Sequence, residues 1–313
     1  MARRRKPRKK KREAPSEEPL EAEATPERTP AAAPASPKKK PWWLIVVVGI
    51  VVAAIAYVEI SNGDTGSTET SGVELDAAPP AIEQLRVRVV ERFPHDIDAF
   101  TQGLLWHEGH LYESTGLRGE SSLRRVALET GEVLERRSVD GRLFAEGLAR
   151  VEERLFQLTW QAGEVHVWSA GGFEHQQVLN YEGEGWGLCH DGEFLVMSDG
   201  SERLTFRQPG SFRVDHVVRV RDDDGFVEEL NELECVDGAI WANVWQTDRI
   251  VRIDPRTGRV TASVDASGLL SMGEGFDADV LNGIAWIPER EHFVITGKLW
   301  PWLFEVEMVP VDE

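Results

Sequence analysis

One glutamate of this 313-residue chain stands in an otherwise apolar segment. Glu146 lies between Ala145 and Gly147 in the run FAEGLA, where a solvent-facing carboxylate is unexpected. A carboxyl group among apolar and aromatic side chains is desolvated, which raises its pKa. Such a carboxyl can accept a proton and return it near neutral pH. Glu146 is therefore the candidate for general acid–base chemistry.

Aromatic rings, side-chain amides and a lysine accompany this glutamate. Trp160 and Trp245 follow Glu146 and Asn231 by 14 residues each, which puts both tryptophans at matching points of the next predicted strand. Lys298 lies in TGKLW, near the end of another strand. The residue types suit a pocket that holds a small polar group between rings. The full set of candidate binding residues is Phe100, Gln102, Phe144, Trp160, Trp186, Asn231, Trp245 and Lys298.

A repeat must position these side chains. Five short strand-like segments recur, and four carry glycine at the equivalent position: Gly103, Gly147, Gly187 and Gly283. In the fourth segment we expect Glu234 at this position. Successive copies of the position are then 44, 40, 47 and 49 residues apart. The residue before that position varies: Gln102, Glu146, Trp186, Leu233 and Asn282. The segments are FTQGL (100–104), FAEGL (144–148), EGWGL (184–188), NELEC (231–235) and VLNGI (280–284).

This spacing predicts an all-β fold, a five-bladed β-propeller over residues 85–313. Short strands alternate with turn signals such as Glu108-Gly109 and Asp237-Gly238, and no long window has a helical stripe. The first strand (86–92) and the last (303–309) are expected to share a blade and close the ring. Six blades are the alternative, if a further copy lies within 202–227. In a propeller the inner strands line a central channel.

The N-terminal quarter has a different composition. Residues 1–41 hold 13 Lys/Arg and 6 Glu and only one large aliphatic residue, so we expect a disordered basic tail. Residues 42–58 carry no charge and have Trp42, Trp43 and Tyr57 at the ends, which predicts a single transmembrane helix in 42–60. A cleavable signal peptide is the alternative. Residues 61–84 are a flexible Gly/Ser/Thr linker.

The charge distribution and the cysteine content limit where the protein can be located and what it can bind. The basic clusters precede the apolar segment, so we expect a cytoplasmic N-terminus, a helix in the inner membrane and a periplasmic or extracellular domain. Residues 42–313 keep 22 basic and 48 acidic side chains, which disfavours nucleic acid as a partner. Cys189 and Cys235 could form a disulfide or remain two buried thiols. No Cys/His spacing resembles a zinc site, and no cofactor is expected.

Several motifs together resemble the glutamine cyclotransferase family, the plant-type and bacterial glutaminyl-peptide cyclotransferases. The resemblance spans 86–309, in order and with regular spacing. The motifs are FPHDIDAFTQGL (93–104), LFAEGL (143–148), LTW (158–160), GWGL (185–188), LNELE (230–234) and TGKLW (296–300). It implies a five-bladed propeller, Glu146 as proton shuttle, and substrate binding by the eight residues named above.

The resemblance implies an acyltransferase whose substrates are peptides or proteins with N-terminal glutamine. Their α-amine would attack the side-chain carboxamide to give pyroglutamate and ammonia, without a metal. One alternative is a non-catalytic, membrane-tethered propeller that binds peptides or an envelope partner. Another is a propeller hydrolase of sugars or lactones. That class usually needs several metal-binding carboxylates in the channel, where Glu184 is the second carboxylate after Glu146.

Overall fold

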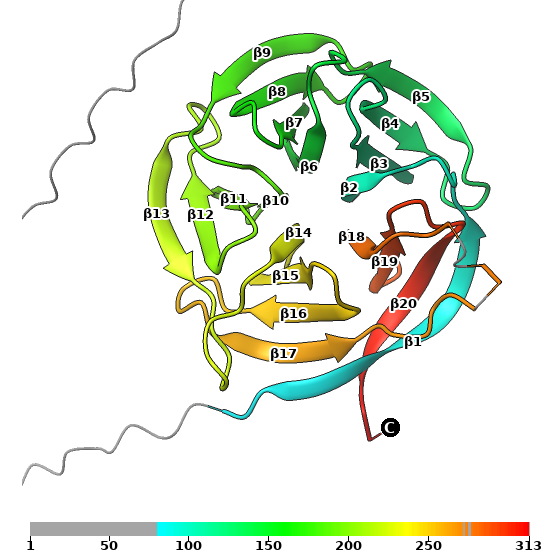
Figure 1. The fold of residues 1–313 in the computed structure, drawn as a ribbon, viewed down its shortest axis with the longest axis vertical. Coiled ribbons are helices and arrows are strands. Elements are labelled where there is room, and N and C mark those ends of the chain that lie inside the picture. The colour runs from blue at the N-terminus through cyan, green and yellow to red at the C-terminus, as the bar shows by residue number, and fades with distance from the viewer. Residues whose placement is uncertain (1–79, 272, 275–276, 313) are drawn as a thin grey trace, which may run out of the picture. The chain divides into compact units, whose positions relative to one another are not determined.

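The protein is all-β in the computed structural model, as the sequence predicts (Figure 1). The structure describes residues 80–271, 273–274 and 277–312. This range contains twenty strands and no helix, and none of its elements could span a membrane as a helix. The predicted tail (1–41), the transmembrane helix (42–60) and the linker up to residue 79 lie outside it. The first strand begins at Glu83, two residues before the expected start of the domain.

Three sheets have four strands each, paired in chain order. The first contains β2 (Thr101–His107), β3 (His110–Thr115), β4 (Ser122–Val126) and β5 (Val133–Ser138). The second contains β6 (Ala145–Val151), β7 (Arg154–Thr159), β8 (Glu164–Ser169) and β9 (His175–Asn180). The third contains β10 (Leu188–His190), β11 (Leu195–Ser198), β12 (Arg203–Arg207) and β13 (Val214–Arg219). Residues 202–227 therefore hold the outer strands of the third sheet.

The remaining eight strands form one sheet in the order β14-β15-β16-β17-β1-β20-β19-β18. The expected pairing of the first and last strands is confirmed, because β1 and β20 are antiparallel with Leu85 opposite Pro310. A parallel contact between β1 and β17 joins the two halves. The strands are β1 (Glu83–Pro94), β14 (Leu230–Val236), β15 (Ala239–Val244), β16 (Arg249–Ile253), β17 (Val260–Asp265), β18 (Leu281–Ile287), β19 (His292–Gly297) and β20 (Trp302–Pro310).

Burial explains where each strand lies. Inner strands such as β2 and β6 are buried along most of their length, whereas the outer strand β9 is almost entirely exposed. Figure 1 shows β2, β6, β10, β14 and β18 around a common centre, with β5, β9, β13 and β17 at the periphery. The turn Glu108-Gly109 has φ of 47° and 80°, as the hairpin between β2 and β3 requires. The inner strands therefore surround the centre, and outer strands such as β9 face the solvent.

Close approach of neighbouring inner strands accounts for the repeated glycine. A Cβ atom at Gly147 would lie 2.5 Å from the backbone nitrogen of Leu188 on β10, and one at Gly103 would lie 2.5 Å from that of Leu148 on β6. Real Cβ atoms essentially never come this near, so a side chain would force the strands apart. The glycine position therefore fixes how tightly the sheets surround the centre.

The structure corrects the alignment of the fourth segment. In β6, β14 and β18 the strand pairing breaks at the same place, after Ala145, Leu230 and Leu281. Counting from these residues, the position of Gly147 and Gly283 belongs to Glu232 and not to Glu234. Asn231 rather than Leu233 then corresponds to Glu146. Leu233 itself is part of the hydrophobic core.

The two cysteines form a disulfide, which settles the choice that the sequence left open. Cys189 on β10 and Cys235 on β14 have Cα atoms 5.5 Å apart. The bond joins two neighbouring inner strands that are 46 residues apart in the chain. It therefore ties the third sheet to the eight-stranded sheet close to the centre of the fold.

Candidate active site

The nine predicted site residues all line one cavity of about 260 Å³. They come from all four sheets, and each lies at or just beyond a strand end. Four belong to the starts of inner strands: Gln102 on β2, Glu146 on β6, Trp186 just before β10 and Asn231 on β14. Phe100 and Phe144 precede β2 and β6. Trp160, Trp245 and Lys298 follow the second strands β7, β15 and β19. The repeat therefore brings these side chains together.

Glu146 is the buried carboxyl of this cavity, with 4% of its surface exposed. Gln102 donates from Nε2 to Glu146 Oε1 over 2.9 Å, and Asn282 donates to Gln102 Oε1 over 3.2 Å. Burial raises the pKa of Glu146 well above its ordinary value. The positive charge of Lys298 opposes this rise, the negative charge of Glu184 adds to it, and the hydrogen bond from Gln102 opposes it. Glu146 is therefore more readily protonated than an exposed glutamate.

Lys298 supplies the buried cation. It is 5% exposed, and its Nζ atom lies 5.0 Å from the centre of the Phe100 ring. Burial lowers the pKa of Lys298, while the nearby carboxylates of Glu146 and Asp279 counteract the decrease. Two backbone hydrogen bonds hold its turn, from Lys298 N to Val280 O and from Asp279 N to Lys298 O. The ammonium group is thus fixed beside an aromatic face and close enough to Glu146 to interact with it.

Aromatic rings form two walls of the cavity. Phe144 packs edge-on against Phe100, with ring centres 6.0 Å apart, and against Trp160, with centres 5.7 Å apart. On the other side Trp186 and Trp245 make a similar contact at 5.4 Å. Edge-to-face pairs of this kind are rigid and apolar. A flexible side chain that enters between them would lose freedom and most of its water.

Asn231 contributes an amide with spare bonding capacity. Its side chain is buried in the cavity lining, and Oδ1 has no hydrogen-bond partner among the described residues. A buried acceptor without a protein partner is satisfied when a ligand donates to it. The amide thus suits a substrate that carries N–H groups.

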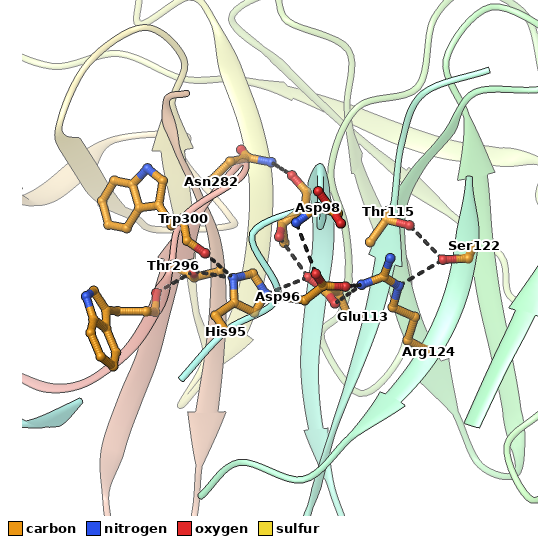
Figure 2. Close-up of polar contacts among 12 residues, drawn as sticks. His95, Asp96, Asp98, Glu113, Thr115, Ser122, Arg124, Asn282, Thr296 and Trp300 are labelled. Atoms are coloured by element: carbon orange, nitrogen blue, oxygen red, sulfur yellow. Dashed lines mark hydrogen bonds and ion pairs between the residues drawn. The ribbon is translucent and has the colours of Figure 1, made fainter. Parts of the chain in front are cut away.

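A buried polar network surrounds His95 and Glu113 (Figure 2). His95 Nδ1 faces the carbonyl oxygen of Trp300 at 2.9 Å, and Nε2 faces Glu113 Oε1 at 3.0 Å. Thr101 donates to the same Glu113 oxygen over 2.7 Å. Burial lowers the pKa of His95, but the charge and hydrogen bond of Glu113, together with the Trp300 carbonyl and the Asp96 carboxylate, outweigh it and raise the pKa. The network therefore links the Lys298 turn to the start of β2, next to Gln102.

Sequence reasoning missed several residues that support the site. Asn282 occupies the same repeat position as Gln102 and Glu146, and this position was the signal that could have identified it. Glu232 was recognisable from the shared Leu-Asn pair in LNG and LNE, which aligns the two segments. His95 and Glu113 carried no comparable signal, because only the folded chain brings them together. Among the described residues, no group of three or more His, Cys, Asp or Glu side chains could hold a metal ion.

The arrangement defines the chemistry that the cavity can perform. One protonatable carboxyl, one cation and two amides surround a space walled by aromatic rings. These are the parts of an acid–base catalyst that binds a small polar group and stabilises negative charge on it.

Comparisons with known proteins agree with this description. The family model for glutamine cyclotransferase matches residues 54–308. The glutaminyl-peptide cyclotransferase of Arabidopsis thaliana is 40% identical over 248 residues, which cover 77% of this chain and 76% of the plant protein. The crystal structure of Myxococcus xanthus glutaminyl cyclase is similar, with 41% identity and a TM-score of 0.68. That match covers 74% of this chain and all of the Myxococcus chain.

The chain belongs to the glutamine cyclotransferase family, and the resemblance seen in the sequence is confirmed. It is accordingly an enzyme of the acyltransferase class.

Proposed function

We propose that the protein is a glutaminyl-peptide cyclotransferase, which converts the N-terminal glutamine of peptides or proteins to pyroglutamate and releases ammonia. Family membership supports the reaction, and one observation supports the mechanism. The cavity holds Glu146, a buried carboxyl with a raised pKa, within hydrogen-bond distance of a fixed amide.

The reaction joins two groups of the same residue. The nitrogen of the neutral α-amine attacks the carbon of the side-chain carboxamide, and a C–N bond forms in a five-membered ring. The bond to the carboxamide nitrogen then breaks. The attacking nitrogen loses one proton and the leaving nitrogen gains one, so the products are the lactam and ammonia. Because attack is intramolecular, the aromatic walls contribute mainly by holding the glutamine side chain folded back.

Glu146 moves the proton in this scheme. Its carboxylate takes a proton from the attacking nitrogen, and the resulting acid delivers it to the leaving nitrogen. General acid–base catalysis of this kind contributes roughly 10²–10⁴-fold. Gln102 holds the carboxyl in place, since Asn282 fixes the amide of Gln102 with its nitrogen toward Glu146.

Lys298 and Asn231 assist at the carboxamide. Its oxygen gains negative charge as the tetrahedral intermediate forms, and the buried ammonium of Lys298 can stabilise that charge. Removing one such donor typically costs about 3–4 kcal/mol in the transition state. Oδ1 of Asn231, which lacks a partner, can accept a hydrogen bond from a substrate nitrogen.

We also propose that the fold is a five-bladed β-propeller. The three four-stranded sheets would be three blades, and the eight-stranded sheet would be two blades joined by the parallel contact of β17 and β1. The fifth blade would then contain β18, β19, β20 and β1, and would close the ring with strands from both ends of the domain.

The location is a proposal based on the sequence. Residues 42–60 would anchor the chain in the inner membrane, with the tail in the cytoplasm and the catalytic domain outside it. A disulfide between Cys189 and Cys235 agrees with an oxidising compartment. Protease added to intact spheroplasts should digest the domain. Digestion only after lysis would contradict the proposed topology.

The function is tested with full-length protein in mild detergent. It should release ammonia and form pyroglutamate from a Gln-initiated dipeptide. The same dipeptide with an acetylated α-amine is the matched control, because it has no nucleophile. Activity should persist with a metal chelator, and loss of activity there would contradict the metal-free scheme. No turnover of any Gln-initiated peptide would favour a non-catalytic peptide-binding protein.

A further inference from the structure

Glu184 contacts two walls of the cavity without lining it. Its Oε2 accepts hydrogen bonds from Trp160 Nε1 over 2.7 Å and from Trp186 Nε1 over 3.2 Å. Its Oε1 accepts from Gln161 Nε2 over 2.9 Å. One carboxylate thus binds indole groups from two sheets, since Trp160 follows β7 and Trp186 precedes β10.

An indole N–H is a donor only, so each ring needs an acceptor to keep one orientation. An ionised acceptor makes these bonds stronger than a neutral one does. Burial alone would raise the pKa of Glu184, but the hydrogen bonds from Gln161, Trp186 and Trp160 outweigh it and lower the pKa. Glu184 is therefore a carboxylate at neutral pH and a suitable partner for both rings.

The backbone around Glu184 strengthens this connection. Gly185 donates its N–H to the carbonyl of Trp160 over 3.0 Å, and Trp160 donates its own N–H to the carbonyl of Phe144 over 2.9 Å. The ring of Trp186 also packs edge-on against the ring of Trp245. Displacement of the Glu184 carboxylate would therefore release two of the cavity's three ring-to-ring contacts at once, those of Trp160 with Phe144 and of Trp186 with Trp245.

We propose that Glu184 is a positioning residue for cyclisation, whose carboxylate clamps the indole rings of Trp160 and Trp186 into the walls of the substrate cavity. This inference rests on the function proposed above and adds to it the group that sets the shape of the glutamine-binding slot. Glu184 also acts on the proton shuttle through its charge, because it is one of the groups that raise the pKa of Glu146.

Two substitutions separate the clamp from the charge. In Glu184→Gln the amide oxygen can still accept from both indoles, and the side chain of Gln161 can turn its oxygen toward the new amide nitrogen. The clamp then survives without the charge. Glu184→Ala removes both. Glu182→Gln removes a charge from an exposed glutamate two residues away and is the matched control.

The experiment measures kcat and KM of the full-length variants on a Gln-initiated dipeptide, across pH. Glu184→Ala should raise KM roughly tenfold to a hundredfold, because misplaced walls hold the folded-back side chain poorly. Glu184→Gln should keep KM close to the wild-type value, because its amide oxygen can still accept from both indoles. Near-UV circular dichroism of each variant reports whether its tryptophans are packed as in the folded wild type. If Glu184→Ala does not fold, the comparison of Glu184→Gln with Glu182→Gln still tests the charge.

The pH profile provides a readout that a purely structural role would not change. The titratable groups that act on Glu146 are Lys298 and Glu184, and Tyr181 also lies within electrostatic range of it. Loss of the Glu184 charge lowers the pKa of Glu146, so the acid limb of kcat/KM should move to lower pH in Glu184→Gln. Glu182→Gln should leave that limb in place.

The outcomes distinguish the two proposals. Unchanged kcat and KM in Glu184→Ala, with an active wild type, would overturn the positioning role alone. The positioning role would also be overturned if Glu184→Gln is as impaired in catalysis as Glu184→Ala. It would be overturned as well if the acid limb of the kcat/KM profile of Glu184→Gln coincides with that of Glu182→Gln. A wild type without cyclisation activity would overturn the proposed function, and the role in cyclisation with it.

Discussion

Replacing Glu232 with glycine should destabilise the protein, although glycine is the residue that the repeat has at this position. Glu232 is fully buried on β14 and receives two backbone hydrogen bonds. Leu104 N on β2 donates to Oε1 over 3.1 Å, and Ile284 N on β18 donates to Oε2 over 2.8 Å. The side chain thus bridges the inner strands where a glycine would leave a gap.

The size of the effect follows from these two bonds. Glu232→Gly leaves two buried N–H groups without acceptors, at about 1–3 kcal/mol each, or about 2–6 kcal/mol in total. For a domain of this size each kcal/mol shifts Tm by about 2–4 °C, so we expect a decrease of about 4–24 °C. Glu232→Gln keeps one good acceptor and should lose about half as much.

Thermal and urea unfolding of the variants would measure this. Glu228→Gly is the matched control, because it makes the same change at an exposed glutamate four residues earlier and should alter stability by about 1 kcal/mol or less. If Glu232→Gly is as stable as the wild type, or more stable than Glu232→Gln, the bridging role of Glu232 is refuted. The repeat's preference for glycine would then outweigh the two hydrogen bonds.

Three further predictions concern stability. The double variant Cys189→Ser, Cys235→Ser should lose about 4 kcal/mol in urea unfolding, because the disulfide closes a 46-residue separation; a loss below about 1 kcal/mol would contradict this. Gly147→Ala should lose about 1–3 kcal/mol or more through its clash with Leu188, and an unchanged urea midpoint would show that the strands separate freely. Burial raises the pKa of Glu146 above its ordinary 4.5, so the native state keeps a proton that the unfolded chain releases as pH rises past 4.5. Stability from this group is full below pH 4.5 and is lost as pH rises, so Glu146→Gln should show a shallower decline above pH 4.5, and parallel slopes would contradict the raised pKa.

Much of the candidate site was predictable because it repeats. Each inner strand presents the residue before its glycine position toward the centre, so Gln102, Glu146 and Trp186 could be aligned without a structure. The fourth segment failed this test because Glu232 and Glu234 are two residues apart on one strand. Alternation alone assigns both to the same face. The Leu-Asn pair shared with the fifth segment favours Glu232, and the interrupted pairing after Leu230 confirms it.

Contacts between distant segments were beyond the reach of the sequence. His95 and Glu113 are 18 residues apart, and Trp300 joins them from the other end of the domain. Glu184 lies in a segment that the repeat did identify, yet its function depends on where two indole nitrogens point. Spacing predicts which residues line a channel, whereas the groups that hold those residues in place depend on side-chain geometry.

The central claim is that Glu146 shuttles the proton during cyclisation, and Glu146→Gln tests it most directly. Glutamine has the same shape and can still accept the hydrogen bond from Gln102, so the cavity should keep its form. We measure kcat for pyroglutamate formation from a Gln-initiated dipeptide by mass spectrometry, at the pH optimum of the wild type. We predict that kcat falls roughly 10²–10⁴-fold while KM changes little. A variant that cyclises the dipeptide at the full wild-type rate would contradict the account.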